Sequence, residues 1–492
     1  MTTRESHERA RTGSMHAYFP AMLRRIGIDL RTLTFDRWIA LRGDVVRIAG
    51  ETWRRPIWAW FLLGFALLCT GLLVGPRVPA AAEDSLCVGN IELQGPFGFS
   101  LNCDSPEFMW LARKPSDLLL HENRRQSRPG LILLAALIEA PLSLIVPPAG
   151  PPTPAYTDVR DPDGLARAFM GDRPGYLAYV LLNFAILLAS FGVLRSVIER
   201  NRPSRDAPTA IILVSTGLLL VANDVTKAFI WSPHTQMFNI LVPVLAVYAT
   251  QRAVGALIGR GFALGMGLAV GLGMTAYPVF AVIPACMLPP AIVALLREKS
   301  PLARRRGAAH IAAFLALAAI PPALWYVIVR VVVGHFSSAE LDMDEVIWMK
   351  DALGKGLDAF LAQWFGYLVQ LLKFAAPQVI ALGVLLAWLA ATVVVPTMRR
   401  KGEIAHLSAA LPVIAIGLYV STALLGFYTC VGWIVERLAY PVIPPLVAAA
   451  GAAAVLVARQ LPPGRRSILA GGFLVIALAQ MIYVVAKDGP WS

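Results

Sequence analysis

The chain has 492 residues, of which 57% are hydrophobic and only 15% charged, and its mean hydropathy is +0.62. Repeated apolar runs of about 18 residues or more exclude an ordinary soluble protein and predict an all-α polytopic membrane protein. The formal net charge is +13. Because Lys and Arg occupy short segments between the apolar runs, this charge indicates cytoplasmic anchoring of loops, and we expect no nucleic-acid partner.

Residues 1–56 are polar and rich in arginine. They are too long and too basic for an ordinary signal peptide, so we interpret them as a cytoplasmic N-terminal segment before a retained first span. The transmembrane domain is expected over residues 57–492. About eleven apolar segments are candidate transmembrane helices: 57–76, 176–196, 208–223, 237–252, 262–278, 279–296, 308–334, 370–396, 408–428, 439–458 and 468–486.

One further apolar stretch, 131–146, decides the topology. It contains Glu139 and Pro141 and is slightly short for a span. If it does not cross, the basic groups between later spans lie on the same side as the arginine-rich leader, as the positive-inside rule requires; if it crosses, they all move outside. The largest groups begin at Arg195, Arg252, Arg297, Arg399 and Arg459.

We therefore expect 131–146 to be an interfacial helix at the external membrane face, within a long first external loop region, 77–175. A second external loop is expected over 335–369. This arrangement predicts a multi-pass protein of a bacterial inner membrane, with a cytoplasmic N-terminus, a periplasmic C-terminus and juxtamembrane helices in the first periplasmic loop. Membrane lipids are therefore expected partners.

Two of the five cysteines, Cys87 and Cys103, lie in the polar part of the first external loop. In an oxidising compartment they can close a disulfide; the alternative is two unrelated thiols. Cys69, Cys286 and Cys430 lie in or beside apolar segments and are interpreted as packing residues.

Two carboxylates, Asp104 and Glu107, follow Cys103 directly. One interpretation is structural: Pro106 is typical of a first helical turn, which would make Asp104 or Ser105 an N-cap. The other is catalytic, because a carboxylate at a membrane-face cavity can act as a general base toward a hydroxyl or amine. We expect Asp104 to be that base, with Glu107 as the second catalytic candidate.

Basic residues in the same loop go against the positive-inside trend. Arg124, Arg125 and Arg128 precede the interfacial segment. A planar guanidinium is suited to phosphate, although contact with lipid headgroups would also explain these residues. Arg125 and Arg128 are therefore candidates for phosphate binding, with contact to lipid headgroups as the alternative.

The later external turns contain further candidates. Asp224 and Lys227 could pair with each other at i, i+3, or contribute to a site. His234 is either a proton carrier or a polar residue at the interface. Glu436 and Arg437 lie at the external mouth of a span, beside a proline-rich helix start, where they are either membrane-edge anchors or part of a site.

No metal site or cofactor is predicted. Two Asp-x-Asp patterns, Asp161/Asp163 and Asp342/Asp344, have a spacing that can hold a divalent cation, but such patterns are common by chance and both lie outside the Cys87–Gly130 loop. The sequence contains no P-loop, no His-Glu-x-x-His and no nucleophile elbow.

The sequence resembles the GT-C superfamily of polytopic glycosyltransferases, which includes the protein O-mannosyltransferases and the aminoarabinose transferases of lipid A. The resemblance covers the topology of most of the chain and three short motifs: Asp104 within Cys103–Ala112, the Arg-Pro-Gly-Leu sequence that begins at Arg128, and the later helix start from Glu436 to Pro444. One departure is that the family's loop acid often has a second acid beside it, whereas Asp104 is followed by Ser105.

This resemblance implies a polyprenyl-phosphate sugar donor and a lipid, glycan or protein acceptor outside the cytoplasm. It implies inverting transfer with Asp104 as base. It also implies that basic residues stabilise the departing lipid phosphate, and the candidates are Arg125, Arg128, Arg437 and Lys227. Two other functions stay open: a surface-polysaccharide polymerase or ligase outside the GT-C group, and a transporter or flippase. The lack of a clear internal repeat, and charges at span ends instead of within spans, argue against transport.

Overall fold

A computed structural model describes residues 57–78, 88–94, 97–120, 123–148, 171–200, 206–337, 347–389, 410–432, 435–487 and 489. The chain divides into two units, Met1–Pro56 and Ile57–Ser492. The predicted N-terminal segment 1–56 lies outside the described residues. All the described residues belong to the second unit.

The second unit is built from helices, in agreement with the predicted all-α class. Their order is α4 (Ile57–Val74), α6 (Ser105–Arg113), η3 (Pro115–Leu119), η4 (Arg124–Ser127), α7 (Pro129–Ile145), α9 (Arg173–Glu199), α10 (Ala207–Val221), α11 (Asp224–Phe229), α12 (Phe238–Ala253), α13 (Arg260–Ala276), η5 (Pro278–Ala281), α14 (Val282–Arg297), α15 (Pro301–Val333), α17 (Ile347–Lys355), α18 (Leu357–Leu389), α21 (Leu411–Val431), α22 (Glu436–Ala439), η7 (Tyr440–Val442), α23 (Ile443–Ala458) and α24 (Pro463–Ala486).

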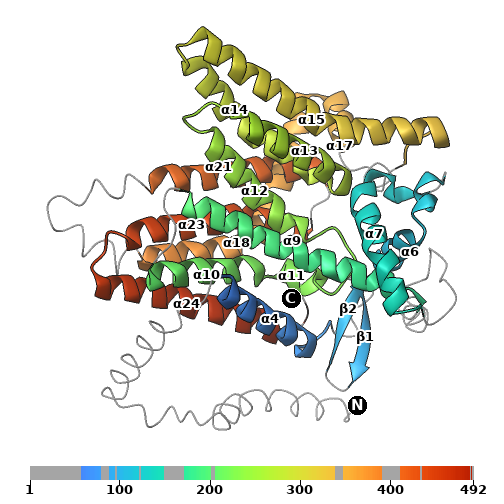
Figure 1. The fold of residues 1–492 in the computed structure, drawn as a ribbon, viewed down its shortest axis with the longest axis horizontal. Coiled ribbons are helices and arrows are strands. Elements are labelled where there is room, and N and C mark those ends of the chain that lie inside the picture. Colours follow the sequence, from blue (N-terminus) through green and yellow to red (C-terminus); the bar gives the residue numbers. More distant parts are fainter. Residues whose placement is uncertain are drawn as a thin grey trace. The chain divides into compact units, whose positions relative to one another are not determined.

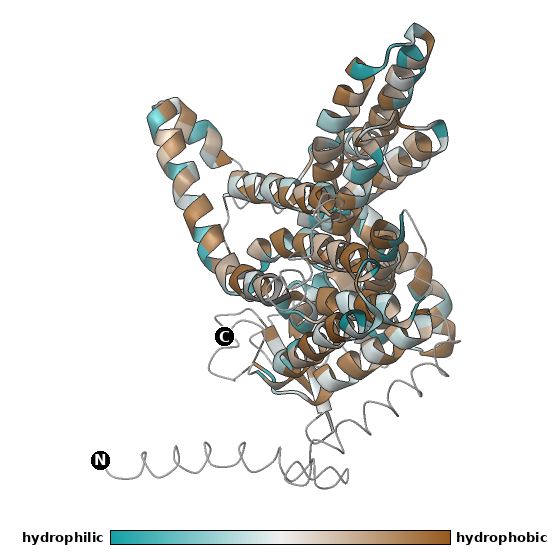
Figure 2. Ribbon diagram, turned by 90° about the vertical axis from the view of Figure 1, so that its left-hand side faces the viewer, coloured by the Kyte–Doolittle hydropathy of each residue, from teal (hydrophilic) through white to brown (hydrophobic). Residues whose placement is uncertain are grey.

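Within the described ranges each of the eleven predicted segments overlaps a helix, but the lengths differ. Within the described ranges, eight helices are long and apolar enough to cross a membrane. These eight are α4, α9, η5–α14, α15, α18, α21, α22–α23 and α24. The other three predicted spans correspond to α10, α12 and α13, which have 15, 16 and 17 residues. Figure 2 shows that apolar residues are prominent throughout the helices of the second unit. The multi-pass membrane class follows from this pattern.

The helices pack in groups that place α12 at the centre. α13 lies along α15, α10 lies along α24 and also contacts α4, and α12 contacts α9, α14, α21 and α23 (Figure 1). Neighbours on several sides explain why α12 is buried along most of its length, including the polar residue Asn239. In contrast, α15 and α18 expose long apolar faces, as expected of helices in contact with lipid.

The region predicted to be the second external loop differs from its predicted form. Residues 335–369 were expected as a loop, yet α17 occupies Ile347–Lys355 and α18 begins at Leu357. α15 likewise begins at Pro301, where Ser300 caps the helix by accepting a hydrogen bond from Ala303 N–H at 3.3 Å. Hydropathy detects only the apolar part of a helix, whereas caps and amphipathic turns extend it beyond the membrane.

The region predicted to be the first external loop contains a β-hairpin that the all-α prediction missed. β1 (Val88–Gln94) pairs antiparallel with β2 (Phe97–Asn102). Alternate hairpin residues Ile91, Phe99 and Leu101 are buried in a small cluster with Met109 of α6 and Tyr176 of α9. A two-stranded hairpin is marginal alone, so this packing stabilises it and fixes where β2 leads into α6.

Helix α7 coincides with the predicted interfacial segment. Its 17 residues span about 25 Å, less than the hydrocarbon core of about 30 Å. Leu131 and Ile132 are buried against the bundle, whereas Leu137 and Leu144 are 72% and 85% exposed. One face of α7 is therefore packed and the other is apolar and open, which suits a helix in contact with lipid.

Candidate functional site

Three segments that are distant in sequence meet around Asp104. Its carboxylate pairs with Arg125, Oδ1 to Nη2 at 2.6 Å, and with His234, Oδ2 to Nε2 at 3.2 Å. Arg125 also pairs through Nε with Glu107 at 2.7 Å. These four residues, Asp104, Glu107, Arg125 and His234, form the acidic half of the candidate site. One-third of the Asp104 side chain is exposed (33%), whereas His234 is 2% exposed.

The segment from β2 to α6 positions the two carboxylates. Asp104 occupies the N-cap of α6 and Pro106 lies in its first turn, as the sequence predicts, but the Asp104 side chain makes no capping hydrogen bond. The Asp104 side chain therefore does not cap the helix. It contacts Arg125 and His234 instead. Glu107, one turn later, comes onto the same side of α6 because residues three apart share a helix face.

Hydrogen bonds between polar residues hold the segment around His234 against α6. The hydroxyl groups of Ser105 and Ser232 lie 2.8 Å apart, and Asn102 N–H donates to Ser232 Oγ at 2.9 Å. From α9, the buried amide of Asn183 donates to the carbonyls of Phe229, Ile230 and Ser232. These bonds satisfy the backbone of a buried turn, and they fix the separation of Asp104 and His234.

The start of α7 brings a second arginine to the same turn. Arg128 Nη1 donates to Thr235 Oγ1 at 3.0 Å, and its guanidinium lies over the ring of Tyr277, 5.6 Å from the centroid. A close helix contact sets this position: a Cβ on Gly130 would lie 2.4 Å from Thr275 Oγ1 at the end of α13. Only glycine allows this approach.

A third arginine, Arg437 of α22, reaches the same region. Its guanidinium lies over the ring of Phe229, 5.9 Å from the centroid, and that ring lies 4.8 Å from the His234 ring. Arg128 and Arg437 both act electrostatically on His234 and Tyr277. We call this pair the basic half of the candidate site. It carries two positive charges beside an acidic half in which two carboxylates share Arg125.

The charges determine the ionisation of Asp104. Burial alone would raise its pKa, but the hydrogen bond to His234 and the positive charges of Arg125 and Arg128 hold the pKa well below its usual range. Arg125 experiences the reverse: burial opposes its charge, while Asp104 and Glu107 raise its pKa. Asp104 is thus a carboxylate at every physiological pH.

The hydrogen bonds of His234 define its state. Thr235 N–H donates to Nδ1 at 2.9 Å, so Nδ1 is an acceptor and carries no proton. Burial lowers the pKa of His234 to about 4, against the opposing effect of Asp104. The ring is therefore neutral at pH 7 with its proton on Nε2, which donates to Asp104.

This low pKa predicts a pH-dependent stability. The unfolded histidine has a pKa of 6.5, so between pH 6.5 and about 4 the unfolded chain binds more protons than the folded one. The contribution is fully present above pH 6.5 and is lost as the pH falls, by about 1–3 kcal/mol in total. We expect the unfolding temperature in detergent to fall from pH 7 to pH 4.5 more steeply for the wild type than for His234→Gln. Equal slopes would contradict the assignment.

Lys227 and Asp224 lie away from this cluster. Lys227 Nζ donates to the carbonyls of Val485 and Lys487, at 3.3 and 2.5 Å, at the C-terminal end of α24. Asp224 pairs with Lys487 Nζ at 2.9 Å. Both predicted site residues therefore connect α11 to the C-terminal end of α24. A cation at this end of a helix interacts favourably with the helix dipole.

We accordingly expect Lys227→Met to reduce stability and leave substrate affinity unchanged. The loss of the two carbonyl contacts should lower the free energy of unfolding by about 1 kcal/mol. Thermal unfolding in detergent measures this, and Lys350→Met, at an exposed lysine of α17, is the matched control. A large rise in donor KM without destabilisation would instead place Lys227 in the site.

Other predicted residues lie outside the Asp104 cluster or outside the described residues. Cys103 is disulfide-bonded, and Cys69, Cys286 and Cys430 are free; the predicted partner Cys87 lies outside the described residues. So do both Asp-x-Asp pairs, Asp161/Asp163 and Asp342/Asp344. The side chains of Arg124 and Glu436 are also outside the description. In the part of the chain that is described, no three His, Cys, Asp or Glu residues are grouped to hold a metal.

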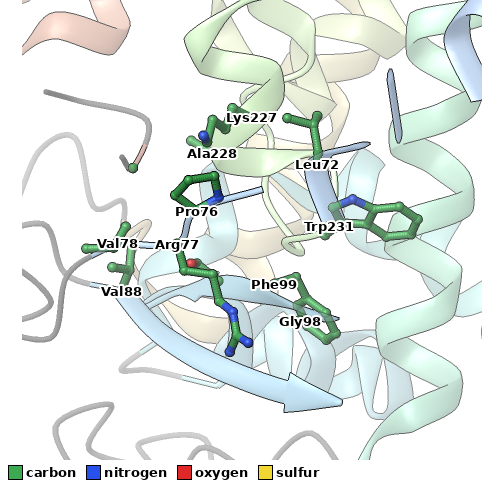
Figure 3. Close-up of a pocket in the computed structure, with 12 residues that line it drawn as sticks. Leu72, Pro76, Arg77, Val78, Val88, Gly98, Phe99, Lys227, Ala228 and Trp231 are labelled. Carbon is green, nitrogen blue, oxygen red and sulfur yellow. The ribbon is translucent and has the colours of Figure 1, made fainter. Parts of the chain in front are cut away.

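A small pocket lies beside the cluster, not at it. It opens between the end of α4, the hairpin and α11, with Arg77 near Gly98 and Lys227 on the opposite side (Figure 3). Trp231, which also lines it, is three residues from His234. Neither Asp104 nor Arg128 lines this pocket. The chemistry suggested by the charges therefore belongs to the Asp104 cluster, where the ionisable groups converge.

The charged residues of the candidate site can be predicted from the sequence, but the residues that position them were missed. Thr235, Asn183, Ser232 and Tyr277 were not predicted as site residues. The available signal was the polar run from Ser232 to Gln236 between two apolar segments, and a lone asparagine inside the span 176–196. A buried asparagine in a span requires hydrogen-bond partners, and here those partners are the backbone of the His234 segment.

No family model, curated protein or solved structure matches this chain. The fold defines the class, a multi-pass α-helical membrane protein, and among the described residues charged side chains from several helix ends converge around Asp104 and His234.

Proposed function

We propose that this protein is an integral membrane glycosyltransferase that transfers a sugar from a polyprenyl-phosphate donor to a cell-envelope acceptor at the periplasmic face. The observation that carries the proposal is the convergence of a reachable carboxylate, Asp104, and a phosphate-suited arginine, Arg128, on the adjacent residues His234 and Thr235. Transfer of a sugar from a lipid phosphate needs one group of each kind. The GT-C resemblance of the sequence supports the same reaction.

The proposed step is an inverting displacement. The acceptor oxygen attacks the anomeric carbon, the bond between that carbon and the phosphate oxygen breaks, and its electron pair remains on the departing lipid phosphate. The acceptor proton passes to the Asp104 carboxylate, the general base. Positive charge close to the leaving oxygen stabilises the transition state as negative charge develops there.

Asp104 requires activation for this role, because a carboxylate with so low a pKa is a weak base. The contact with Arg125 helps to keep the pKa of Asp104 low, and it is the contact that an acceptor could displace. An acceptor hydroxyl that takes the place of Arg125 Nη2 at Oδ1 would raise the pKa of Asp104. Arg125 would keep its second partner, Glu107, which gives Glu107 a supporting role and not that of a second base.

The geometry favours Arg128 and Arg437 as the phosphate-binding residues among the four predicted. Arg125 is buried between two carboxylates, and Lys227 contacts the end of α24. Arg128 and Arg437 are half-buried over the rings of Tyr277 and Phe229, and both act electrostatically on His234. A lipid phosphate could reach them while its tail remains in the membrane beside the apolar face of α7.

The orientation can be tested by cysteine labelling. The positive-inside pattern places Lys114 outside and Gln460 inside, and both side chains are exposed. In intact spheroplasts, an impermeant maleimide should label Lys114→Cys and leave Gln460→Cys unlabelled until the membrane is opened. The wild type controls for its own free cysteines. The reverse pattern would move the candidate site to the cytoplasm.

The function itself is tested with purified protein in liposomes that contain a panel of radiolabelled polyprenyl-phosphate sugars and an envelope extract as acceptor. We expect one donor to be consumed, with free polyprenyl phosphate released and the label moved to the acceptor. Consumption of lipid-diphosphate oligosaccharide alone would indicate a polymerase or ligase. Movement of lipid across the bilayer without consumption would indicate a flippase. Either result would replace the proposal.

A further inference from the structure

His234 is enclosed too well to contact a substrate. Its ring lies between Phe108 and Phe229, with centroids 5.6 and 4.8 Å away, and 2% of the side chain is exposed. Any effect of His234 on the reaction must therefore pass through Asp104, its one charged partner within hydrogen-bond distance in the described part of the chain. This geometry argues against a role of His234 as a proton carrier, because a proton carrier needs a path to solvent or substrate.

The direction of its hydrogen bonds makes the same distinction. Nδ1 accepts from Thr235 N–H, so the remaining proton of the neutral ring is on Nε2 and points at Asp104 Oδ2. A nitrogen that already holds a proton cannot take another from Asp104. The groups that act on the ring are Asp104 beside α6, Arg128 of α7 and Arg437 of α22, and the two arginines oppose its protonation.

Thr235 connects this arrangement to the basic half of the site. Its backbone N–H fixes the histidine ring, while its side-chain oxygen accepts from Arg128 Nη1 at 3.0 Å. One residue thereby sets the position of the predicted base relative to the predicted phosphate ligand. The backbone of the turn is in turn held by Asn183 and Ser232.

We propose that His234 and Thr235 are positioning residues with separate tasks: His234 orients the Asp104 carboxylate as a fixed donor, and Thr235 orients Arg128 toward the donor phosphate. The inference rests on the proposed function for its kinetic consequences, but the histidine tautomer does not depend on any activity.

The kinetic test uses pairs of variants in the full chain. His234→Met keeps the volume and removes the donor, and His234→Gln keeps an N–H at the position of Nε2. We expect His234→Met to lower kcat roughly tenfold to a hundredfold with little change in donor KM, and His234→Gln to recover most of that loss. Equal loss in both variants would overturn the orienting role of His234.

Thr235→Val removes the hydroxyl and keeps the backbone N–H, whereas Thr235→Ser keeps both. Because Arg128 is assigned to the departing phosphate, we expect Thr235→Val to lower kcat/KM for the donor about tenfold, and Thr235→Ser to restore it. No loss in Thr235→Val, or an equal loss in Thr235→Ser, would contradict the assigned task. Thermal unfolding of every variant shows whether a loss of activity comes from a loss of fold. A variant that loses activity but unfolds at the wild-type temperature has lost the positioning contact alone.

The second measurement is nitrogen NMR of the detergent-solubilised protein with labelled histidine. The chain has 7 histidines, so His234→Gln identifies the signal by its disappearance. We expect a neutral ring protonated on Nε2 from pH 5.5 to 8, with an Nε2 shift that changes in Asp104→Asn. An imidazolium or an Nδ1-protonated ring at pH 7 overturns the inference. If the tautomer is as expected but no donor is consumed, the proposed function fails and the donor role of His234 stands.

Discussion

Asp104→Asn should lower sugar transfer by roughly 10²–10⁴-fold, the usual contribution of a general base. An amide has nearly the same shape as the carboxylate and can still contact His234, but it cannot take the acceptor proton. The initial rate of label transfer at saturating donor, measured in liposomes, gives this value. Donor KM should stay within a few-fold, because the phosphate is predicted to contact the basic half of the site.

The same substitution also leaves Arg125 with one carboxylate instead of two, so stability must be followed. Removing one partner of a buried ion pair costs about 3–5 kcal/mol in unfavourable cases; here Glu107 remains, and we expect less. Asp358→Asn, at an exposed acid in α18, is the matched control and should retain full activity. Full transfer by a folded Asp104→Asn protein would exclude Asp104 as the base.

Arg128→Ala should lower kcat/KM by roughly 10²–10³-fold, because a positive donor at a leaving phosphate stabilises charge that develops in the transition state. Arg128→Lys should recover only part of this loss, since an ammonium cannot make the two parallel hydrogen bonds of a guanidinium. Steady-state kinetics with the consumed donor measures both. Arg330→Ala, at an exposed arginine near the end of α15, should be neutral.

The partner of this prediction is Arg437. If both arginines bind one phosphate, the effect of Arg128→Ala and Arg437→Ala together should be smaller than the product of the two single effects, because residues that act as a unit are not additive. A simple product would mean that the two arginines act on separate groups. The double-mutant cycle thus tests the convergence that the structure places around His234 and Tyr277.

The helical membrane class could be predicted from the sequence because it follows from local composition. Each apolar segment reports its own preference for the membrane, and in the described ranges each of the eleven overlaps a helix. The ends of these helices were less accessible: α18 begins at Leu357, thirteen residues before the apolar run at 370. The hairpin at Val88–Asn102 was missed because its strands are short and are stabilised by contacts with α6 and α9.

The candidate site shows the same division. By itself, the sequence determined that Asp104, Arg125, Arg128, His234 and Arg437 are polar or charged groups beside apolar segments, because charge at the edge of a span is visible residue by residue. Only the tertiary structure decided which of them meet. Lys227 and Arg437 look equivalent in the sequence, yet one contacts the end of α24 and the other lies near His234. Pairings across more than 100 residues depend on how helices pack, and no local pattern encodes them.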